Sequence, residues 1–187
     1  MPIDTQRAVD EAAAPDRGVA DLAAVWLALA AIPDPEIPVV SIVDLGIVRA
    51  VAREGAGVVV RVTPTYSGCP ATELIFGAIR DSLAAIGLPD ARVEVQLAPA
   101  WTTDWIAADG KRRLREYGIA PPGSAIPGVA AIDVRGISPL RAAGVVVPCP
   151  RCGSTRTRLT AQFGSTACKA LYRCDECLEP FDYFKPH

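Results

Sequence analysis

Apolar residues recur at helical spacing in two stretches of the chain, and each stretch ends at a helix-breaking residue. The first stretch runs from Leu22 to Ile32 and stops before Pro33. The second stretch follows Pro70 and ends at Gly87. Since residues three and four positions apart lie on the same face of a helix, each stretch predicts an amphipathic helix with one buried face.

Three other stretches have the pattern of β-strands. Residues 47–54 and 58–63 are rich in β-branched side chains and are joined by Gly55-Ala56-Gly57, which predicts a β-hairpin. Residues 92–97 alternate between apolar and polar side chains, so they predict a half-buried strand. The apolar positions of that strand, expected to face the core, are Val93, Val95 and Leu97.

The order of these elements and the composition of the remaining chain predict four parts. Helix, strand, strand, helix and strand form a compact α+β domain at residues 19–99. An acidic, alanine-rich stretch at 1–18 precedes it and is expected to be a disordered tail. Residues 100–144 are expected to be a proline-rich connector with a short helix near Lys111–Tyr117. Residues 145–187 form a separate module built on cysteines.

Composition and charge narrow the class of protein. The chain has 187 residues, of which 50% are apolar and 21% are charged, so it can bury a core. Its net charge of −2 argues against binding to nucleic acid through bulk charge. The longest apolar run with helical character is shorter than the roughly 20 residues of a membrane span, and the start lacks the pattern of a secretory signal. We therefore expect a cytoplasmic protein with reduced thiols and no membrane partner.

The distribution of histidine removes several kinds of catalysis. The chain has a single histidine, His187, at its last position. Ser-His-Asp and Cys-His catalysis, the Glu-x-x-His iron sites of helical bundles and His-ligated catalytic zinc all need internal imidazoles. The six cysteines are then the most reactive groups, and we do not expect the chain to be an enzyme by itself.

The C-terminal cysteines have the spacing of a metal site. Cys149 and Cys152 form one C-x-x-C turn, and Cys174 and Cys177 form another. Four soft thiolates supplied by two such turns suit a tetrahedral zinc ion, and Gly153 can take the positive φ that this kind of turn uses. A module of this size cannot bury a large enough hydrophobic core by itself. We therefore expect zinc binding to contribute to its folding free energy. The pattern predicts a zinc ribbon; the alternatives are an iron–sulfur cluster and a thioredoxin-like redox pair.

The charge of the ribbon bears on its partner. Residues 149–187 carry six basic and four acidic side chains, and four thiolates with one zinc ion add two negative charges. The sum is near zero, which favours a protein partner over a phosphate backbone.

Cys69 is a candidate for a reactive or metal-capturing thiol. Pro70 is expected at the first helical position, which would place Cys69 at the N-cap, where exposed N–H groups stabilise a thiolate. The alternative is a small buried cysteine that caps the helix. The polar residues that could gather near it are Asp34, Glu36, Thr63 and Thr65.

Three further features each have more than one interpretation. Cys168 lies six residues before Cys174 and could be a spare ligand, a functional thiol or a core residue. A basic cluster could be a solvated helix face or could bind an acidic protein surface; its members are Lys111, Arg112, Arg113 and Arg115. Trp101 and Trp105 are four residues apart and are expected to pack together on one helical turn rather than bind a ligand.

Several longer motifs resemble known families. The segments DPEIPVVSIVDLGIV and TPTYSGCPA resemble the small α+β domain shared by cytosolic iron–sulfur assembly factors and the bacterial SufT protein. The segments PAWTTDWI, GKRRLREYGIAPP and FGSTACKALYRCDECLEPFDYFK resemble the PaaD family (also called PaaJ) of bacterial phenylacetate degradation. The resemblance runs from about Leu22 to Lys185, and its motifs occur in the family's order, so it is more specific than either C-x-x-C pair.

The resemblance implies a non-catalytic accessory role with 1,2-phenylacetyl-CoA epoxidase, a ring-epoxidising multicomponent oxygenase. That enzyme has a di-iron part and a reductase with flavin and a [2Fe–2S] cluster. The implied role is assembly or maintenance of its iron–sulfur or other metal centres. The implied partners are the epoxidase components, above all the iron–sulfur reductase, and the implied cofactors are structural Zn²⁺ and a transient Fe–S cluster or iron.

The resemblance also assigns residues. The assembly-domain pattern falls on Asp34, Glu36, Thr63 and Cys69, and the PaaD ending falls on Cys149, Cys152, Cys168, Cys174 and Cys177. Two other functions stay open at this point. One is a stably bound structural component of the oxygenase, and the other, with less support, is a nucleic-acid-binding zinc ribbon.

Overall fold

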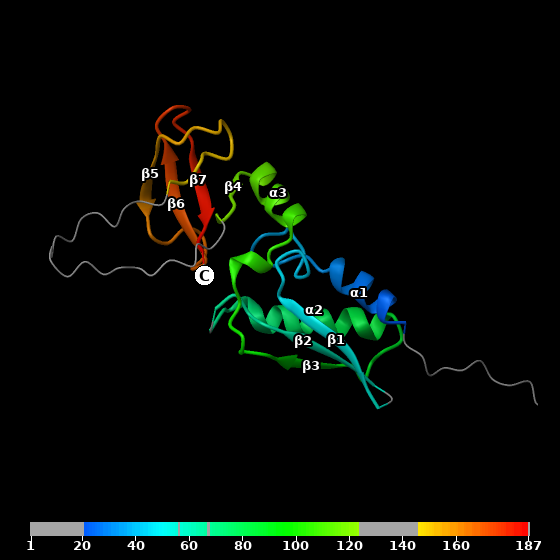
Figure 1. The fold of residues 1–187 in the computed structure, drawn as a ribbon. Helices are drawn as coiled ribbons and strands as arrows, with labels where there is room; N and C mark the ends of the chain where they lie inside the picture. Colours follow the sequence, from blue (N-terminus) through cyan, green and yellow to red (C-terminus); the bar gives the residue numbers. More distant parts are fainter. Residues whose placement is uncertain (1–20, 56, 67, 124–145, 187) are drawn as a thin grey trace, which may run out of the picture.

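A computed structural model describes residues 21–55, 57–66, 68–123 and 146–186 and shows two units packed against each other (Figure 1). The expected tail at 1–18 lies outside the described residues, and so does the second half of the expected connector. Within the described part of the chain, no helix combines the length and the apolar character needed to cross a membrane.

The first unit contains two helices and one three-stranded sheet. The elements are α1 (Leu22–Ala30), β1 (Val48–Glu54), β2 (Gly57–Val62), α2 (Ala71–Ala85) and β3 (Arg92–Val95). The sheet has the order β1-β2-β3, with β1 and β2 antiparallel and β2 and β3 parallel. The helix, strand, strand, helix, strand order expected from the sequence is confirmed.

The core of the first unit lies between the helices and the sheet. Val25 and Leu29 of α1 are buried beside Ile79 and Leu83 of α2, as the helical spacing predicts. One detail of the third strand differs from the prediction. Val95 is 48% exposed and Leu97 65% exposed, because β3 is an edge strand that ends at Val95, whereas Val93 packs against the core.

The second unit is a four-stranded sheet. It consists of β4 (Ile119–Ala120), β5 (Thr157–Ala161), β6 (Lys169–Cys174) and β7 (Pro180–Phe184), in the order β4-β7-β6-β5. Strands β5, β6 and β7 are antiparallel neighbours, while β4 pairs with β7 in parallel. The sheet therefore takes one strand from the region expected to be connector.

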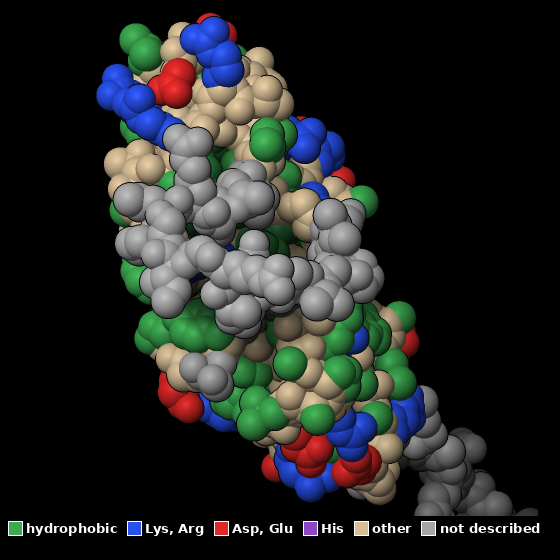
Figure 2. Space-filling model, turned by 60° about the vertical axis from the view of Figure 1, so that its left-hand side comes forward, with side chains coloured by type: hydrophobic (Ala, Val, Ile, Leu, Met, Phe, Trp, Pro, Cys, Tyr) green, Lys and Arg blue, Asp and Glu red, His purple; other side chains and the backbone are tan. Residues whose placement is uncertain are grey.

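Charged side chains on both units are paired with opposite charges. Glu54 of β1 accepts from Arg61 at 2.6 Å and from Arg92 at 2.7 Å across the first sheet. On the second unit, Arg156 lies 2.9 Å from Glu176 and Arg158 lies 3.0 Å from Asp175. Figure 2 shows acidic and basic side chains lying side by side at the lower end of the molecule. Mixed charge of this kind leaves little excess positive potential for a phosphate backbone.

A short helical segment joins the two units. It comprises the 3-10 helix η1 (Thr103–Trp105) and α3 (Ala108–Tyr117). The helix expected near Lys111–Tyr117 is confirmed and begins three residues earlier. Gly46 has a φ of +68°, and a Cβ added there would lie 2.6 Å from the carbonyl oxygen of Trp105. Glycine at this position therefore permits close contact between the loop after α1 and the helical segment.

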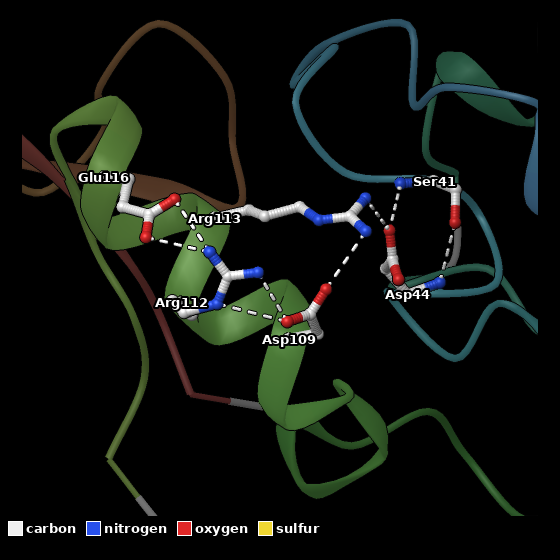
Figure 3. Close-up of polar contacts among 6 residues, drawn as sticks. All are labelled: Ser41, Asp44, Asp109, Arg112, Arg113 and Glu116. Atoms are coloured by element: carbon white, nitrogen blue, oxygen red, sulfur yellow. Dashed lines mark hydrogen bonds and ion pairs between the residues drawn. The ribbon is translucent and has the colours of Figure 1, made fainter.

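Two members of the basic cluster on α3, Arg112 and Arg113, form ion pairs within the protein (Figure 3). Arg112 pairs with Asp109 and Glu116 along the exposed face of the helix, which favours the solvated-face interpretation for this residue. Arg113 also pairs with Asp109 and reaches Asp44 at 3.0 Å. Asp44 belongs to the loop after α1, so this contact attaches α3 to the first unit.

The two tryptophans do not share a helical turn, so the expectation of one packed pair on a helix is wrong. Only Trp105 belongs to the 3-10 helix, where the guanidinium of Arg49 lies 3.3 Å from its ring centroid. Trp101 precedes that helix, is buried, and donates from Nε1 to the carbonyl of Leu45 at 2.9 Å. Its ring centroid lies 6.0 Å from that of Phe184, which connects the first unit to the end of β7.

Candidate functional site

The four cysteines of the two C-x-x-C turns form one cluster. The Sγ atoms of Cys149 and Cys177 are 3.8 Å apart, and those of Cys152 and Cys174 are 3.6 Å apart. All four sulfurs lie within 4.8 Å of one another. Zn–S bonds of about 2.3 Å in a tetrahedron place the sulfurs about 3.8 Å apart, so the observed spacing fits a metal ion of this kind.

Local backbone geometry holds these turns in place. Gly153 has the expected positive φ, at +75°, and its N–H donates to the carbonyl of Cys149 at 2.9 Å. Leu178 takes the matching position after Cys177 with a φ of +64°. The sequence did not indicate this second left-handed residue, because a leucine rarely adopts that conformation.

Backbone N–H groups prepare one of the sulfurs for a metal. The N–H of Cys177 lowers the pKa of Cys174, and the N–H of Glu176 acts in the same direction. Together they outweigh the opposing effect of burial, so the pKa is about 7. The N–H of Glu176 lies 3.4 Å from that sulfur. A thiol with a low pKa is readily deprotonated, which is the form that binds metal.

A second group of candidates lines a cavity where the two units meet. Asp34 and Glu36 come from the loop after α1, Cys69 from the turn before α2, and Cys168 from the residue before β6. The space measures about 20 Å³, room for roughly one water molecule. The apolar residues that line it include Ile37, Leu45, Ile47, Ile75 and Phe184. The structure thus brings together four site candidates that are far apart in the sequence.

Thr63 does not join this group. Its side chain is buried, and its Oγ1 donates to the carbonyl of Gln96 at 2.8 Å, across the ends of β2 and β3. Thr65, two residues later, does line the cavity. Thr63 therefore closes the edge of the sheet next to the cavity, and it does not present its hydroxyl inside.

Asp34 shapes the loop that carries it. Its Oδ1 accepts hydrogen bonds from the N–H groups of Glu36 at 2.9 Å and Ile37 at 2.8 Å. Burial raises the pKa of Asp34, while these two N–H groups and the positive charge of Lys169 act in the opposite direction. The carboxyl group is thus largely committed to the turn of this proline-rich loop.

Cys168 and Glu36 meet directly across the junction. The Cys168 thiol donates to Oε2 of Glu36 at 3.9 Å, and its sulfur lies 3.0 Å from Oγ1 of Thr166. Burial raises the pKa of Cys168, and it also raises the pKa of Glu36, assisted there by the charge of Asp34. Cys168 is not one of the four clustered cysteines, so it is no spare ligand of the ribbon site in this structure.

Cys69 lies one residue earlier than expected relative to its helix. The N-cap of α2 is Pro70, whose φ of −65° already has the helical value, and α2 begins at Ala71. The prediction that Cys69 is the N-cap residue is therefore wrong. The carbonyl of Cys69 accepts from the N–H of Thr72 at 3.1 Å, and its half-buried side chain lines the cavity.

Two residues near the cavity were not identified from the sequence. The hydroxyl of Tyr66 hydrogen-bonds with the thiol of Cys69; burial, followed by negative charge at Cys69, raises the pKa of Tyr66 to about 12. Lys169 is buried and lies 3.6 Å from the carboxylate of Asp182. The position of Tyr66, three residues before Cys69, was a signal available in the sequence, whereas nothing in the pattern marked Lys169 as buried.

The cavity differs from the ribbon site in one respect that matters for metal binding. Within the described part of the chain, only the ribbon cysteines form a group of three or more ligands with all atoms close enough to hold one ion. The donors of the cavity line a common space without converging on one point. Its side chains would have to move to enclose an ion.

Comparisons with known proteins match each part of the chain separately. Residues 22–97 match the family model described as an iron–sulfur cluster assembly protein. Residues 137–185 match the model described as the PaaD zinc beta ribbon domain.

A curated protein of Escherichia coli (strain K12), provisionally named as one of the subunits of 1,2-phenylacetyl-CoA epoxidase, is 54% identical over 162 residues. The alignment covers 86% of this chain and 90% of that protein.

Solved structures also match part of the chain. A domain of unknown function from Bacillus anthracis is 30% identical with a TM-score of 0.45, covering 48% of this chain and 87% of that chain. A protein from Mycobacterium tuberculosis described as associated with [Fe–S] complex assembly and repair is 34% identical with a TM-score of 0.31, covering 58% and 92%.

Proposed function

The chain belongs to the PaaD family, which includes the epoxidase component of Escherichia coli, and from this premise we propose that it is an accessory protein of phenylacetate breakdown. Its task is to assist the assembly or maintenance of the epoxidase's iron–sulfur or other metal centre, in the cytoplasm. The match of residues 22–97 to an iron–sulfur cluster assembly protein supports this role.

The observation that carries the proposal is that Asp34, Glu36, Cys69 and Cys168 line one cavity. Two thiols and two carboxylates are donors that bind iron, and they come from both units of the chain. Packing of Cys168 and Phe184 in the core of the first unit means that the ribbon helps to build this cavity.

The two metal-handling regions have different tasks in this proposal. Zn²⁺ held by Cys149, Cys152, Cys174 and Cys177 would stabilise the ribbon, which docks the partner protein. Cys69, as a thiolate, would hold iron or a cluster as cargo, assisted by Asp34 or Glu36, and release it by ligand exchange. The chain itself turns over no substrate.

The proposal is tested in cells that depend on the epoxidase. Replacement of the chain by its Cys69→Ser variant should leave the variant folded, with the zinc content of the ribbon unchanged. The iron–sulfur reductase purified from those cells should contain much less cluster than reductase made with the unaltered chain. Normal iron content and normal epoxidase activity in that strain would exclude a role for this thiol.

A second candidate function is a structural component that stays bound to the oxygenase. The name of the Escherichia coli relative, which places it among the epoxidase subunits, favours this function. So does the exposure of Val95, in the edge strand β3, and of Leu97, just after it. This function predicts co-purification with the active complex at fixed stoichiometry. An active complex reconstituted without the chain would argue against it.

A further inference from the structure

The cavity at the junction is too small for a metal cluster in its present form. Its space of about 20 Å³ holds roughly one water molecule. Even a [2Fe–2S] cluster has four core atoms, whereas one metal ion replaces one water. The size of the space therefore favours a single ion as the occupant.

The separation of two donors has nearly the value that a shared ion requires. The Cys168 sulfur and Oε2 of Glu36 are 3.9 Å apart. A tetrahedral ion with metal–sulfur bonds of about 2.3 Å and metal–oxygen bonds of about 2.1 Å would place these atoms about 3.6 Å apart. A shift of a few tenths of an ångström would let both atoms bind one ion. Cys69 lines the same space and would have to move closer to become a third ligand.

The charges around the cavity favour a cation. Asp34 and Glu36 both line it, so two acidic side chains face one small space. The nearby positive charge is Lys169, which is already paired with Asp182 at 3.6 Å. A divalent cation would compensate carboxylates that one shared ammonium does not neutralise.

Glu36 also offers a route for the ion. Besides the cavity, it lines an open polar groove on the second unit together with Ser165, Lys169 and Asp182. The carboxylate of Glu36 is thus common to the cavity and the groove. An ion in the groove would meet oxygen ligands first and could pass from them to the two thiols by way of Glu36.

We propose that the cavity binds a single divalent transition-metal ion, with Cys168 and Glu36 as ligands beside Cys69, so that the iron cargo enters as one Fe(II) ion and not as a preassembled cluster. This inference rests on the proposed function. It makes Cys168, a residue of the ribbon, part of the cargo site.

Co(II) is a suitable probe, because its spectrum reports thiolate ligands. Full-length protein with one equivalent of zinc in the ribbon is titrated with Co(II) in the absence of oxygen. One further equivalent should bind, with a thiolate-to-cobalt charge-transfer band of two sulfurs. Cys168→Ser should halve that band and weaken binding by about tenfold or more, and Glu36→Gln should weaken binding while the band persists. Glu73→Gln is the matched control, since this carboxylate lies near Cys69 in sequence and does not line the cavity.

Several results would overturn the inference. They are the absence of further Co(II) binding, an unchanged spectrum in the Cys168→Ser variant, and uptake of two or more iron ions when Fe(II) and sulfide are supplied. Because Cys168 is buried, Cys168→Ala provides a second variant that keeps an apolar side chain, and the zinc content of each variant reports folding. Failure of Co(II) binding together with impaired reductase in the Cys69→Ser strain would reject this inference alone. Co(II) binding together with normal reductase in that strain would reject the proposed function.

Discussion

The ribbon cluster and the junction cavity bring together side chains able to bind metal in opposite ways. In the ribbon, two short turns bring four sulfurs within 4.8 Å of one another. In the cavity, donors at positions 34, 36 and 69 of the first unit meet the donor at position 168 only because the two units pack together. A site built from local turns is complete as soon as its metal binds, whereas a site built by packing can open and close. The difference suits a resident ion in one place and a cargo in the other.

The ionisation of the ribbon cysteines is uneven. Backbone N–H groups lower the pKa of Cys174 to about 7, whereas at Cys177 the N–H of Glu179 is outweighed by burial and by hydrogen bonds with neighbouring thiols, which raise its pKa to about 12. In the cavity, burial raises the pKa of Cys168 and, across the junction, that of Glu36. Metal ligands must lose their protons to bind. In both places a bound cation would have to displace thiol protons, and in the ribbon Cys174 is the cysteine whose proton is lost most readily.

Removal of the ribbon metal is expected to have the largest effect. Structural zinc contributes about 10–16 kcal/mol of apparent binding free energy in small zinc modules. A strong chelator, or Cys174→Ser, should unfold β5, β6 and β7 while β1, β2 and β3 stay folded. Hydrogen exchange measured strand by strand distinguishes the two units. Protection of the ribbon strands that survives verified metal loss would contradict a structural role for the ion.

Phe184→Ala should have the next largest effect, because this residue of the second unit packs in the core of the first unit and lines the junction cavity. It ends β7, lies 6.0 Å from the ring of Trp101 and lines the cavity. Loss of a buried phenylalanine side chain costs about 3–5 kcal/mol of unfolding free energy. Chemical denaturation should report this loss, and labelling of Cys168 by a thiol reagent should become faster. Unchanged labelling would show that the packing of the units does not protect the cavity.

Two glycine substitutions separate backbone strain from close contact. Gly46 and Gly87 both have positive φ, so alanine at either position costs about 1–2 kcal/mol. A Cβ at Gly46 would also collide with Trp105, whereas nothing lies within 4 Å of a Cβ at Gly87. Gly46→Ala should therefore lower the free energy of unfolding clearly more than Gly87→Ala. Equal losses of unfolding free energy would mean that the helical segment can shift to accommodate a Cβ at position 46.

The pH dependence of stability tests the burial of Asp34. Because burial raises its pKa in the folded protein, its contribution to stability is present below pH 3.8, the value for the free side chain, and is lost as the pH rises through the folded pKa. Each pKa unit corresponds to about 1.4 kcal/mol. The stability of the unaltered protein relative to Asp34→Asn should therefore fall with rising pH, over the range in which zinc stays bound. Thermal unfolding of both proteins at several pH values measures this, and a relative stability that rises with pH would contradict it.

The smallest expected effect comes from the surface pairs of α3. Arg113 pairs with Asp44, which is only 17% exposed, while the partners of Arg112 are both more than half exposed. Arg113→Ala should cost about 0.5–1 kcal/mol, more than Arg112→Ala. Denaturation at low and high salt measures the difference. A larger loss for Arg112→Ala would mean that the contact of α3 with the first unit contributes little.

The fold of the first unit was largely predictable, because its signals are local. Helical spacing from Leu22 and after Pro70 gave both helices, and the β-branched runs around Gly55 gave the hairpin. The exposure of Val95 was not predictable, because alternation alone does not distinguish an edge strand from a central one. Strand β4 was missed for a related reason, since two residues that pair with a distant strand carry no periodicity.

The two candidate sites also differ in how far the sequence predicts them. The ribbon ligands followed from the spacing of four cysteines, because a C-x-x-C turn has nearly fixed geometry. The meeting of Glu36 with Cys168 could not be read from spacing, since 132 positions separate the two residues. Nor could the burial of Lys169, which depends on how β6 packs at the junction.

The most direct test of the two-site account follows the metals from this chain to its partner. Full-length protein carrying zinc in the ribbon and ⁵⁷Fe(II) in the cavity is mixed with iron-free epoxidase reductase and inorganic sulfide, the proteins are separated, and both metals are measured in each. The account predicts that ⁵⁷Fe moves to the reductase while zinc stays behind, and that the Cys69→Ser chain delivers almost none. Iron that stays with the chain, or equal delivery by the Cys69→Ser variant, would contradict it.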